Sequence, residues 1–378
     1  MSNDQKKIRV MHVIAGNQMG GTERMLCYLV PNYEKEKFET CLVTCASPSK
    51  YTEEWQRAGI EQLYFLHTRK PVSLAAFIRI FKHIKQWKPD VIFAFGLRVN
   101  ISARIAAWLC RVPVFITGQR GIEDWKGKGA VLLEKITSIF VDVYIGNSKA
   151  CCDMLARREK ISASKLQVIY NGIQLNIPKD YKQRAADIRA RHYPDNAVVI
   201  GSIGRLNRVK GHEYLIKAVP KILKQIPEAF FVIVGHDQYK QYIHKLVKKM
   251  GLDHKVILPG YSADVASWLE SFDVFALPSI SEGMPVSVLE AFLMKCPVVA
   301  TQTGGTPELV KNHETGLLVP ARDSAALATA IVELVLKQEL GYEMSERAFV
   351  LASKSYSLEQ MMCRYCKTIE ALYLKTKR

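Results

Sequence analysis

The chain has 378 residues, of which 48% are hydrophobic and 24% charged, a composition typical of folded globular proteins and a length that predicts two domains. The formal net charge of +17 is concentrated early, since residues 1–180 carry 27 Lys and Arg against 16 Asp and Glu. This excess favours nucleic acid, an anionic membrane surface or phosphorylated small molecules as partners. No helix-turn-helix, zinc-finger or RRM signature is present, which argues against sequence-specific nucleic-acid binding.

The N-terminal residues and the cysteines indicate the cellular compartment in which the protein is expected. The first apolar run is short and interrupted by Arg9 and His12, so it predicts a strand rather than a signal peptide. No window reaches the roughly 18 apolar residues of a membrane span. The nine cysteines lie mostly in apolar surroundings, as free thiols of the cytosol do, and Cys363–Cys366 is a lone CxxC pair that indicates zinc or redox chemistry only weakly. We expect a cytoplasmic protein, with peripheral association with the membrane left open.

Short β-branched runs alternate with longer amphipathic stretches along the whole chain. This alternation predicts parallel sheets with helices on both faces, and its occurrence twice in tandem predicts two doubly wound, Rossmann-like α/β domains. The predicted strands are 8–15, 38–45, 60–66, 90–95, 112–117, 142–147 and 165–170, followed by 197–204, 229–235, 255–260, 273–279 and 297–301.

Apolar periodicity lapses around Gly172 and Pro178, so the boundary between the domains is expected in the segment 171–184. We therefore expect an N-terminal domain over 1–172 and a C-terminal domain over 173–355. Ligands of such sheets bind at the carboxyl ends of strands, and two facing domains predict a site in a central cleft.

Two glycine-containing loops follow predicted strands. Gly16–Glu23, with Gly20 and Gly21, comes directly after the first strand and precedes a helix, a place where backbone N–H groups can approach a phosphate. Its spacing is not that of a dinucleotide-binding fingerprint, and a tight turn explains the glycines equally well. The second loop, 204–211, lacks a P-loop ending but carries Arg205 and Lys210, which together suit a diphosphate.

The stretch EGMPVSVLE, residues 282–290, contains two carboxylates that are poorly spaced for sharing a proton. Pro285 suits the first turn of a helix, which leaves Glu282 in the preceding loop and Glu290 in the second turn. Carboxylates accept hydrogen bonds from hydroxyls, and the helix N-terminus between them favours an anion. A ligand with hydroxyls at both ends and a charged centre, such as a nucleotide-sugar, fits this arrangement.

Several segments of the sequence resemble those of a known family. The block SISEGMPVSVLEAF, followed by PVVATQTGGTPELV and TGLLVP, is similar to the signature of the retaining family-4 glycosyltransferases of bacterial glycan biosynthesis, which have the GT-B fold. GRLNRVKG, GNQMGGTER and YNGI (170–173) resemble that family's phosphate-binding loops and interdomain segment, so the resemblance covers nearly the whole chain.

The resemblance implies roles for individual residues. Glu290 would hold the nucleotide ribose, Arg205 and Lys210 would neutralise the diphosphate, and Gly20 and Gly21 would close on the donor from the other domain. Glu282 would position the donor sugar, together with the backbone around it: Gly283, Met284, Pro285 and Val286. It also implies that the last helical stretch, within 356–378, packs back on the N-terminal domain.

The sequence departs from the family at one point. Many members carry a His after the strand that corresponds to 112–117, whereas this chain has Gly118-Gln119-Arg120-Gly121. Gln119 or Arg120 could replace that His in positioning the substrate, but neither is an obvious general base. A front-face retaining mechanism does not require one, because the leaving phosphate can accept the proton. No Asp-x-Asp triplet occurs, so we expect neither a metal site nor another cofactor.

Residues 69–88 form a predicted basic amphipathic helix, with an apolar stripe of Phe77, Ile80, Phe81, Ile84 and Trp87. Packing of the stripe on the sheet is one interpretation. The other is docking of the cations Arg79, Lys82 and Lys85 on anionic headgroups, with help from the loop Trp125–Lys128.

The predicted function is metal-independent, retaining transfer of a hexosyl or N-acetylhexosaminyl group. The donor would be a nucleotide-diphosphate sugar, expected to be UDP-linked, and the acceptor a hydroxyl of a glycan or lipid-linked glycan. A sugar-nucleotide epimerase and a non-catalytic nucleotide-sugar-binding subunit remain as alternatives.

Overall fold

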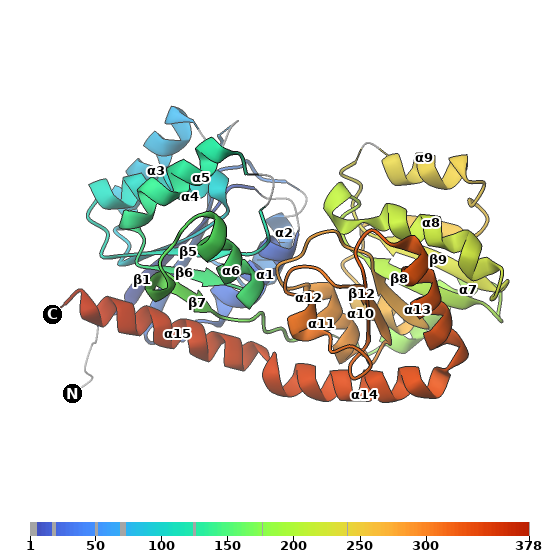
Figure 1. Ribbon diagram of the computed structural model, residues 1–378. Coiled ribbons are helices and arrows are strands. Elements are labelled where there is room, and N and C mark those ends of the chain that lie inside the picture. Colours follow the sequence, from blue (N-terminus) through green and yellow to red (C-terminus); the bar gives the residue numbers. More distant parts are fainter. Residues whose placement is uncertain are drawn as a thin grey trace. The chain divides into compact units, whose positions relative to one another are not determined.

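The computed structural model describes residues 6–16, 20–49, 52–68, 73–123, 126–175, 177–239 and 241–377. The chain divides into two compact units, one formed by residues 1–172 together with 358–378, the other by residues 173–357 (Figure 1). Each unit is built around one parallel sheet, which confirms the predicted class of two doubly wound α/β domains.

The first unit contains a seven-stranded sheet in the order β3-β2-β1-β4-β5-β6-β7. Its chain order departs from its spatial order between β1 and β4, where the switch point of the sheet lies. The strands are β1 (Ile8–Ile14), β2 (Phe38–Thr44), β3 (Leu63–Phe65), β4 (Val91–Phe95), β5 (Val114–Gln119), β6 (Val143–Gly146) and β7 (Leu166–Val168). The helices are α1 (Gly21–Leu29), α2 (Thr52–Arg57), α3 (Leu74–Trp87), α4 (Leu97–Leu109), α5 (Lys128–Thr137), α6 (Lys149–Arg158) and α15 (Leu358–Lys375), with 3-10 turns η1 (Val30–Asn32), η2 (Ser138–Phe140) and η3 (Ala163–Lys165).

The second unit contains a six-stranded sheet in the order β10-β9-β8-β11-β12-β13, with its switch point between β8 and β11. The strands are β8 (Val198–Ile203), β9 (Ala229–Val234), β10 (Val256–Gly260), β11 (Val274–Leu277), β12 (Val298–Thr301) and β13 (Leu317–Val319). The helices are α7 (Tyr181–His192), α8 (His212–Leu223), α9 (Tyr242–Lys249), α10 (Val265–Glu270), α11 (Val286–Leu293), α12 (Thr306–Leu309), α13 (Ser324–Leu336) and α14 (Gln338–Ser355), with the 3-10 turn η4 (Arg208–Lys210).

The twelve predicted strands are all present, but the sequence analysis missed β13. This strand is only three residues long, and its apolar run Leu317-Leu318-Val319 is too short to predict a strand by itself. The strand β13 is part of the sheet because its three residues pair with Val299, Ala300 and Thr301 of β12.

The predicted basic helix begins at Leu74, capped by the Ser73 hydroxyl, and residues 69–72 lie outside the described part of the chain. Its stripe faces the core: Ile80, Ile84 and Trp87 are buried, and Phe77 and Phe81 pack against the same cluster. The helix thus serves as a packed layer on the sheet, as one of the two interpretations held.

The helix α15 belongs to the first unit although residues 173–357 of the other unit separate the two in sequence. Its buried side chains recur on one face: Met361, Met362, Tyr365, Cys366, Ile369 and Tyr373. Gln167 of β7 donates to the Thr368 hydroxyl at 2.8 Å, and the Tyr365 ring lies 5.7 Å from that of Phe93 in β4. None of the helices in the described part of the chain is both long and apolar enough to span a bilayer.

The core of the first unit encloses one histidine, His12 in β1. It is fully buried, packed among the rings of Tyr33, Phe93 and Phe95, and neither ring nitrogen has a hydrogen-bond partner among the described residues. Burial lowers the pKa of His12 from 6.5 to about 3, so the imidazole is neutral in the folded protein at neutral pH.

His12 therefore predicts a loss of stability in acid. Below pH 6.5 the unfolded chain binds a proton at this residue that the folded chain does not, so the free energy of unfolding falls as the pH drops. The contribution is about 2 kcal/mol between pH 6.5 and pH 5. Urea unfolding at both pH values should show a smaller acid loss for His12→Leu than for the wild type.

The exposed His254 provides the matched control, since His254→Leu should leave the acid loss of the wild type unchanged. Equal acid losses in His12→Leu and the wild type would contradict the assignment of this effect to His12.

Candidate functional site

Three loops meet at the carboxyl edge of the second sheet, following the neighbouring strands β8, β11 and β12. The backbone N–H of Ile280, after β11, donates to the Val209 carbonyl in η4 at 2.8 Å. The Thr303 hydroxyl, after β12, donates to the Ile280 carbonyl at 2.8 Å. The loops are thus joined to one another at the switch point, where doubly wound sheets bind their ligands.

An ion pair connects two of these loops. The Lys210 ammonium lies 2.7 Å from Oε1 of Glu282, and the Ser279 hydroxyl donates to the same oxygen at 2.6 Å. The Lys210 and Glu282 side chains keep 20% and 10% of their surface exposed, so the pair is shielded without being sealed from solvent. A ligand that reaches this edge meets a carboxylate held in one orientation and an ammonium next to it.

Gly211 permits the close approach of these loops. Its φ is 61°, in the left-handed region, and a Cβ at this position would lie 2.1 Å from the Pro278 carbonyl oxygen. Only glycine fits such a position without strain or displacement. Lys210 precedes Gly211 directly, so the glycine fixes the point from which the Lys210 side chain reaches Glu282.

Arg205 lies in the same loop, half-buried, between the end of β8 and η4. Among the residues that the structure describes, none forms a hydrogen bond or ion pair with its guanidinium, whereas Lys210 is already paired. Of the two cations predicted to bind a diphosphate, Lys210 is therefore neutralised by Glu282 and Arg205 is not, and a planar guanidinium suits two oxygens of a phosphate.

The predicted residues 283–290 lie in and before α11. Pro285 is the N-cap, with an extended backbone at ψ 113°, rather than part of the first turn, and the helix begins at Val286. The side chains of Met284 and Val286 are buried, and Gly305 N–H donates to the Gly283 carbonyl at 2.9 Å. A ligand at this place would be held by the backbone more than by these side chains.

Glu290 lies in the second turn of α11 and is 1% exposed. His212, the first residue of α8, is also buried, and burial with the nearby Lys210 ammonium lowers its pKa to about 3. His212 is therefore neutral at pH 7, and the charged side chains of the three loops are Arg205, Arg208, Lys210 and Glu282.

The predicted residues of the first unit lie at the carboxyl edge of its own sheet. Gly20 caps α1 and Gly21 is the first residue of that helix, with open space where a Cβ would project. Residues 17–19 of the same predicted loop lie outside the described residues.

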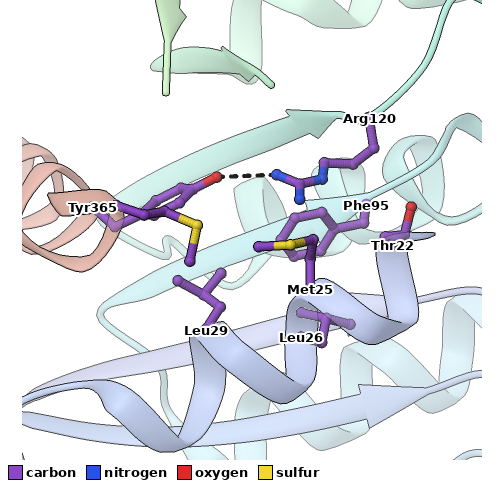
Figure 2. A pocket seen from close by; sticks show the side chains of 8 residues that line it. Thr22, Met25, Leu26, Leu29, Phe95, Arg120 and Tyr365 are labelled. Atoms are coloured by element: carbon purple, nitrogen blue, oxygen red, sulfur yellow. Dashed lines mark hydrogen bonds between the residues drawn. The ribbon is translucent and has the colours of Figure 1, made fainter. Parts of the chain in front are cut away.

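A small pocket lies next to the start of α1. Figure 2 shows the Arg120 guanidinium and the Tyr365 hydroxyl, joined by a hydrogen bond, above apolar side chains from α1. The pocket is lined by Thr22, Met25, Leu26, Leu29, Phe95, Arg120, Met361 and Tyr365.

Arg120 is held by two hydrogen bonds. It donates to Oδ1 of Asn171 at 2.6 Å and to the Tyr365 hydroxyl at 3.3 Å. Burial raises the pKa of Tyr365 although the Arg120 charge opposes this, so the hydroxyl remains protonated. Arg120 thus connects the end of β5 with α15 and with the last residues before the second unit.

Gln119 ends β5 and is 4% exposed. Its amide donates to the Gly121 carbonyl at 2.6 Å and to the Glu123 carboxylate at 3.2 Å, and Glu123 in turn pairs with Lys126 at 2.7 Å. The buried Lys126 also pairs with Glu159, the C-cap of α6, at 2.7 Å. These contacts fix the loop after β5; Asp124 and Trp125 lie outside the described residues.

The structure therefore brings Lys210 and Glu282 together and places Arg205 in the same group of loops. Sequence reasoning missed Ser279, Asn171 and Tyr365. Ser279 could have been suggested by its position three residues before Glu282, whereas Tyr365 has no local signal because it comes from α15.

Over the described ranges, no group of three or more His, Cys, Asp or Glu side chains lies close enough together to hold a metal ion.

Both halves of the chain match families of known proteins. Residues 19–177 match "Glycosyltransferase Family 4", and residues 183–350 match "Glycosyl transferases group 1". The gap between the two matches lies close to the division of the chain at residues 172 and 173.

Two curated relatives align over most of their own length and of this chain. The UDP-Gal:alpha-D-GlcNAc-diphosphoundecaprenol alpha-1,3-galactosyltransferase of Escherichia coli is 27% identical, over 88% of this chain and 89% of its own. A Campylobacter jejuni alpha-1,4-N-acetyl-D-galactosaminyltransferase, named for an undecaprenol-diphosphate-linked acceptor, is 26% identical over 88% and 90%. The solved structure of HepE from Anabaena with UDP and glucose has a TM-score of 0.85 at 20% identity, covering 96% of this chain and all of that one.

The geometry at Gly211 predicts an unequal effect of alanine at two glycines that both have positive φ. Gly211→Ala should lower the free energy of unfolding by roughly 3 kcal/mol or more, because the left-handed backbone and the contact with Pro278 both oppose a Cβ. Gly251→Ala should cost only about 1 kcal/mol, since its φ is 66° with nothing within 4 Å. Urea unfolding measures both; similar costs would show that the contact with Pro278 is unimportant.

Proposed function

Because the chain belongs to the GT-B glycosyltransferases, with a family-4 and a group-1 part, we propose that it transfers a hexosyl or N-acetylhexosaminyl group from a nucleotide-diphosphate sugar. The acceptor is a hydroxyl of a glycan or lipid-linked glycan, and UDP is the proposed nucleotide. The observation that carries the proposal is the Lys210–Glu282–Ser279 cluster at the carboxyl ends of β8 and β11, with the Arg205 guanidinium in the same loop.

The cluster suits the charge and the hydroxyls of such a donor. Arg205 and Lys210 bind the diphosphate and stabilise the negative charge that grows on it as the sugar leaves, which is the main electrostatic task in this reaction. Lys210 must exchange Glu282 for a phosphate oxygen, so the carboxylate becomes available to a sugar hydroxyl when the donor binds. After the exchange, Lys210 binds the diphosphate of the donor and Glu282 binds a hydroxyl of its sugar.

Each of the remaining predicted residues has a proposed role. Glu290 accepts hydrogen bonds from the ribose hydroxyls, and the backbone of Gly283, Met284, Pro285 and Val286 borders the sugar. Gly20 and Gly21 at the start of α1 leave room for close approach of the donor. Gln119 and Arg120 form the acceptor side, and the bonds of Arg120 to Asn171 and Tyr365 hold it there.

We propose that the reaction retains the anomeric configuration and needs no metal. The acceptor oxygen bonds to the anomeric carbon on the face from which the diphosphate leaves, and the hydroxyl proton passes to the departing diphosphate oxygen. Gln119 supports this route, since its amide cannot act as a base and is engaged by Gly121 and Glu123. The names of the Escherichia coli and Campylobacter jejuni relatives support an undecaprenol-diphosphate-linked acceptor.

The first test is transfer from a panel of UDP-, GDP- and ADP-sugars, with lipid extract as the source of acceptor and with EDTA in parallel. Acceptor-stimulated release of one nucleoside diphosphate, unaffected by EDTA, is expected. Glu290→Ala should reduce it at least roughly 100-fold, because a buried hydrogen-bonding carboxyl group is lost from the proposed donor site. The exposed Glu228→Ala is the matched control and should retain full activity.

Release of no nucleotide from any donor, while UDP still raises the melting temperature, would favour a binding-only subunit. Interconversion of the donor without transfer would favour an epimerase. Proton NMR of the product's anomeric signal, compared with that of the donor, distinguishes retention from inversion.

A second experiment separates the two members of the ion pair. Lys210→Met should weaken UDP binding by roughly 10- to 100-fold, because a charged partner of the diphosphate is removed. Glu282→Gln should bind UDP at least as tightly as the wild type, because Lys210 no longer has a competing carboxylate, yet it should lose most transfer activity. Calorimetry with UDP and initial rates with the identified donor measure the two effects; equal losses of UDP affinity in both variants would contradict the exchange of partners.

A further inference from the structure

The helix α5 has its polar side inward and its apolar side outward. Its two buried residues are Glu134 and Thr137, whereas Leu132, Leu133 and Ile136 are 57%, 42% and 57% exposed. A surface helix of a globular domain normally buries its apolar stripe and exposes its charges. Hydrophobic packing therefore does not account for the side that α5 turns to the domain.

A buried ion pair holds α5 in this orientation. Arg104 of α4 is fully buried and donates to the Glu134 carboxylate at 2.6 Å and to the Thr137 hydroxyl at 2.6 Å. Tyr144 of β6 donates to the same carboxylate oxygen at 3.2 Å. Rotating the helix to bury its leucines would bring Glu134 to the surface and leave the Arg104 guanidinium buried without its partner, at high cost.

The exposed apolar surface continues beyond α5. Ile139 in η2 is 71% exposed, and Trp108 at the end of α4 is 57% exposed, with its ring 5.1 Å from that of Phe140 in η2. We call Trp108, Leu132, Leu133, Ile136 and Ile139 the outer apolar face. Contiguous apolar surface of this kind marks a site of interaction with a protein or a membrane.

The charges around the outer apolar face decide between these partners. The helices α3, α4 and α5 lie next to one another (Figure 1), and Glu134 is the only carboxylate in their sequences. Because Glu134 is buried against Arg104, these helices present no acidic group to solvent. Their exposed charges are cationic, with Lys128 and Lys135 on α5 and Lys82 and Lys85 on α3.

We propose that the outer apolar face inserts into the headgroup region of an anionic lipid bilayer, with the surrounding lysines on the lipid phosphates. Amphipathic helices that lie in a membrane surface combine an apolar face with flanking cations in this way. Trp is enriched at the same interface between lipid and water. The docking surface is centred on α5 rather than on the basic helix α3, whose apolar stripe is packed on the sheet and whose Arg79 donates to the carbonyls of Leu66 and His67.

This surface does not depend on the proposed transfer reaction, so it is tested without donor or acceptor. The probes are vesicles of phosphatidylcholine with and without phosphatidylglycerol, sedimented with the full chain at low and high salt. The wild type should bind the anionic vesicles at low salt and bind pure phosphatidylcholine weakly. Leu132→Glu/Ile136→Glu should reduce binding at least about tenfold, and Lys128→Glu/Lys135→Glu should reduce it on anionic vesicles only.

The matched control places two glutamates at exposed apolar positions of the second unit. Leu336→Glu/Val350→Glu, at residues 66% and 46% exposed, should bind vesicles nearly as the wild type does. Melting temperatures of the variants should stay close to that of the wild type, because every substituted side chain is exposed. Trp108 provides a spectroscopic signature: its emission should shift to the blue on anionic vesicles, and Trp108→Phe should lose that part of the shift.

Three results would overturn the proposal. The first is the absence of vesicle binding by the wild type, and the second is vesicle binding that the Leu132→Glu/Ile136→Glu variant retains in full. The third is a concentration-dependent dimer in sedimentation velocity that this variant abolishes, which would assign the outer apolar face to a second copy of the chain.

Discussion

Every strand pairing in the described part of the two sheets is parallel, and the position of the candidate site depends on this constraint. In a parallel sheet all strands end at the same edge, so loops distant in sequence are brought together there. Lys210 and Glu282 are separated by three strands and three helices along the chain, yet β8 and β11 are neighbours in the sheet. The Lys210–Glu282 ion pair follows from that pairing, and Gly211 provides the clearance that the pair requires.

The ion pair also suits the anion that the proposed function places at this site. An isolated carboxylate beside a phosphate-binding loop would repel an incoming diphosphate, and an isolated ammonium would bind any anion. Pairing the two, with Ser279 on the same carboxylate oxygen, limits both effects. In the proposed function Arg205 attracts the ligand first. Exchange of partners at Lys210 would then couple binding of the phosphates to the orientation of Glu282.

The sequence was sufficient for the fold class, for the twelve predicted strands and for the positions of Glu282 in a loop and Glu290 in the second turn of a helix, because periodicity and loop chemistry are local properties. It was insufficient where a feature depends on contacts between distant segments. The short strand β13 is defined by its pairing with β12, and Tyr365 reaches Arg120 only because α15 returns to the first unit. For α5, nothing in KGAVLLEKIT by itself indicates that Glu134 faces inward, because its partner Arg104 comes from α4.

The return of α15 has a consequence for synthesis of the protein on the ribosome. The surface that Tyr365, Ile369 and Tyr373 cover in the first unit stays uncovered until all of residues 173–357 have been translated. At ordinary elongation rates this interval lasts roughly 10 to 40 seconds. During that time the apolar surface that α15 covers is exposed, and Arg120 lacks its Tyr365 partner. The first unit therefore cannot complete its fold until the whole second unit has been translated, although it comes first in the sequence.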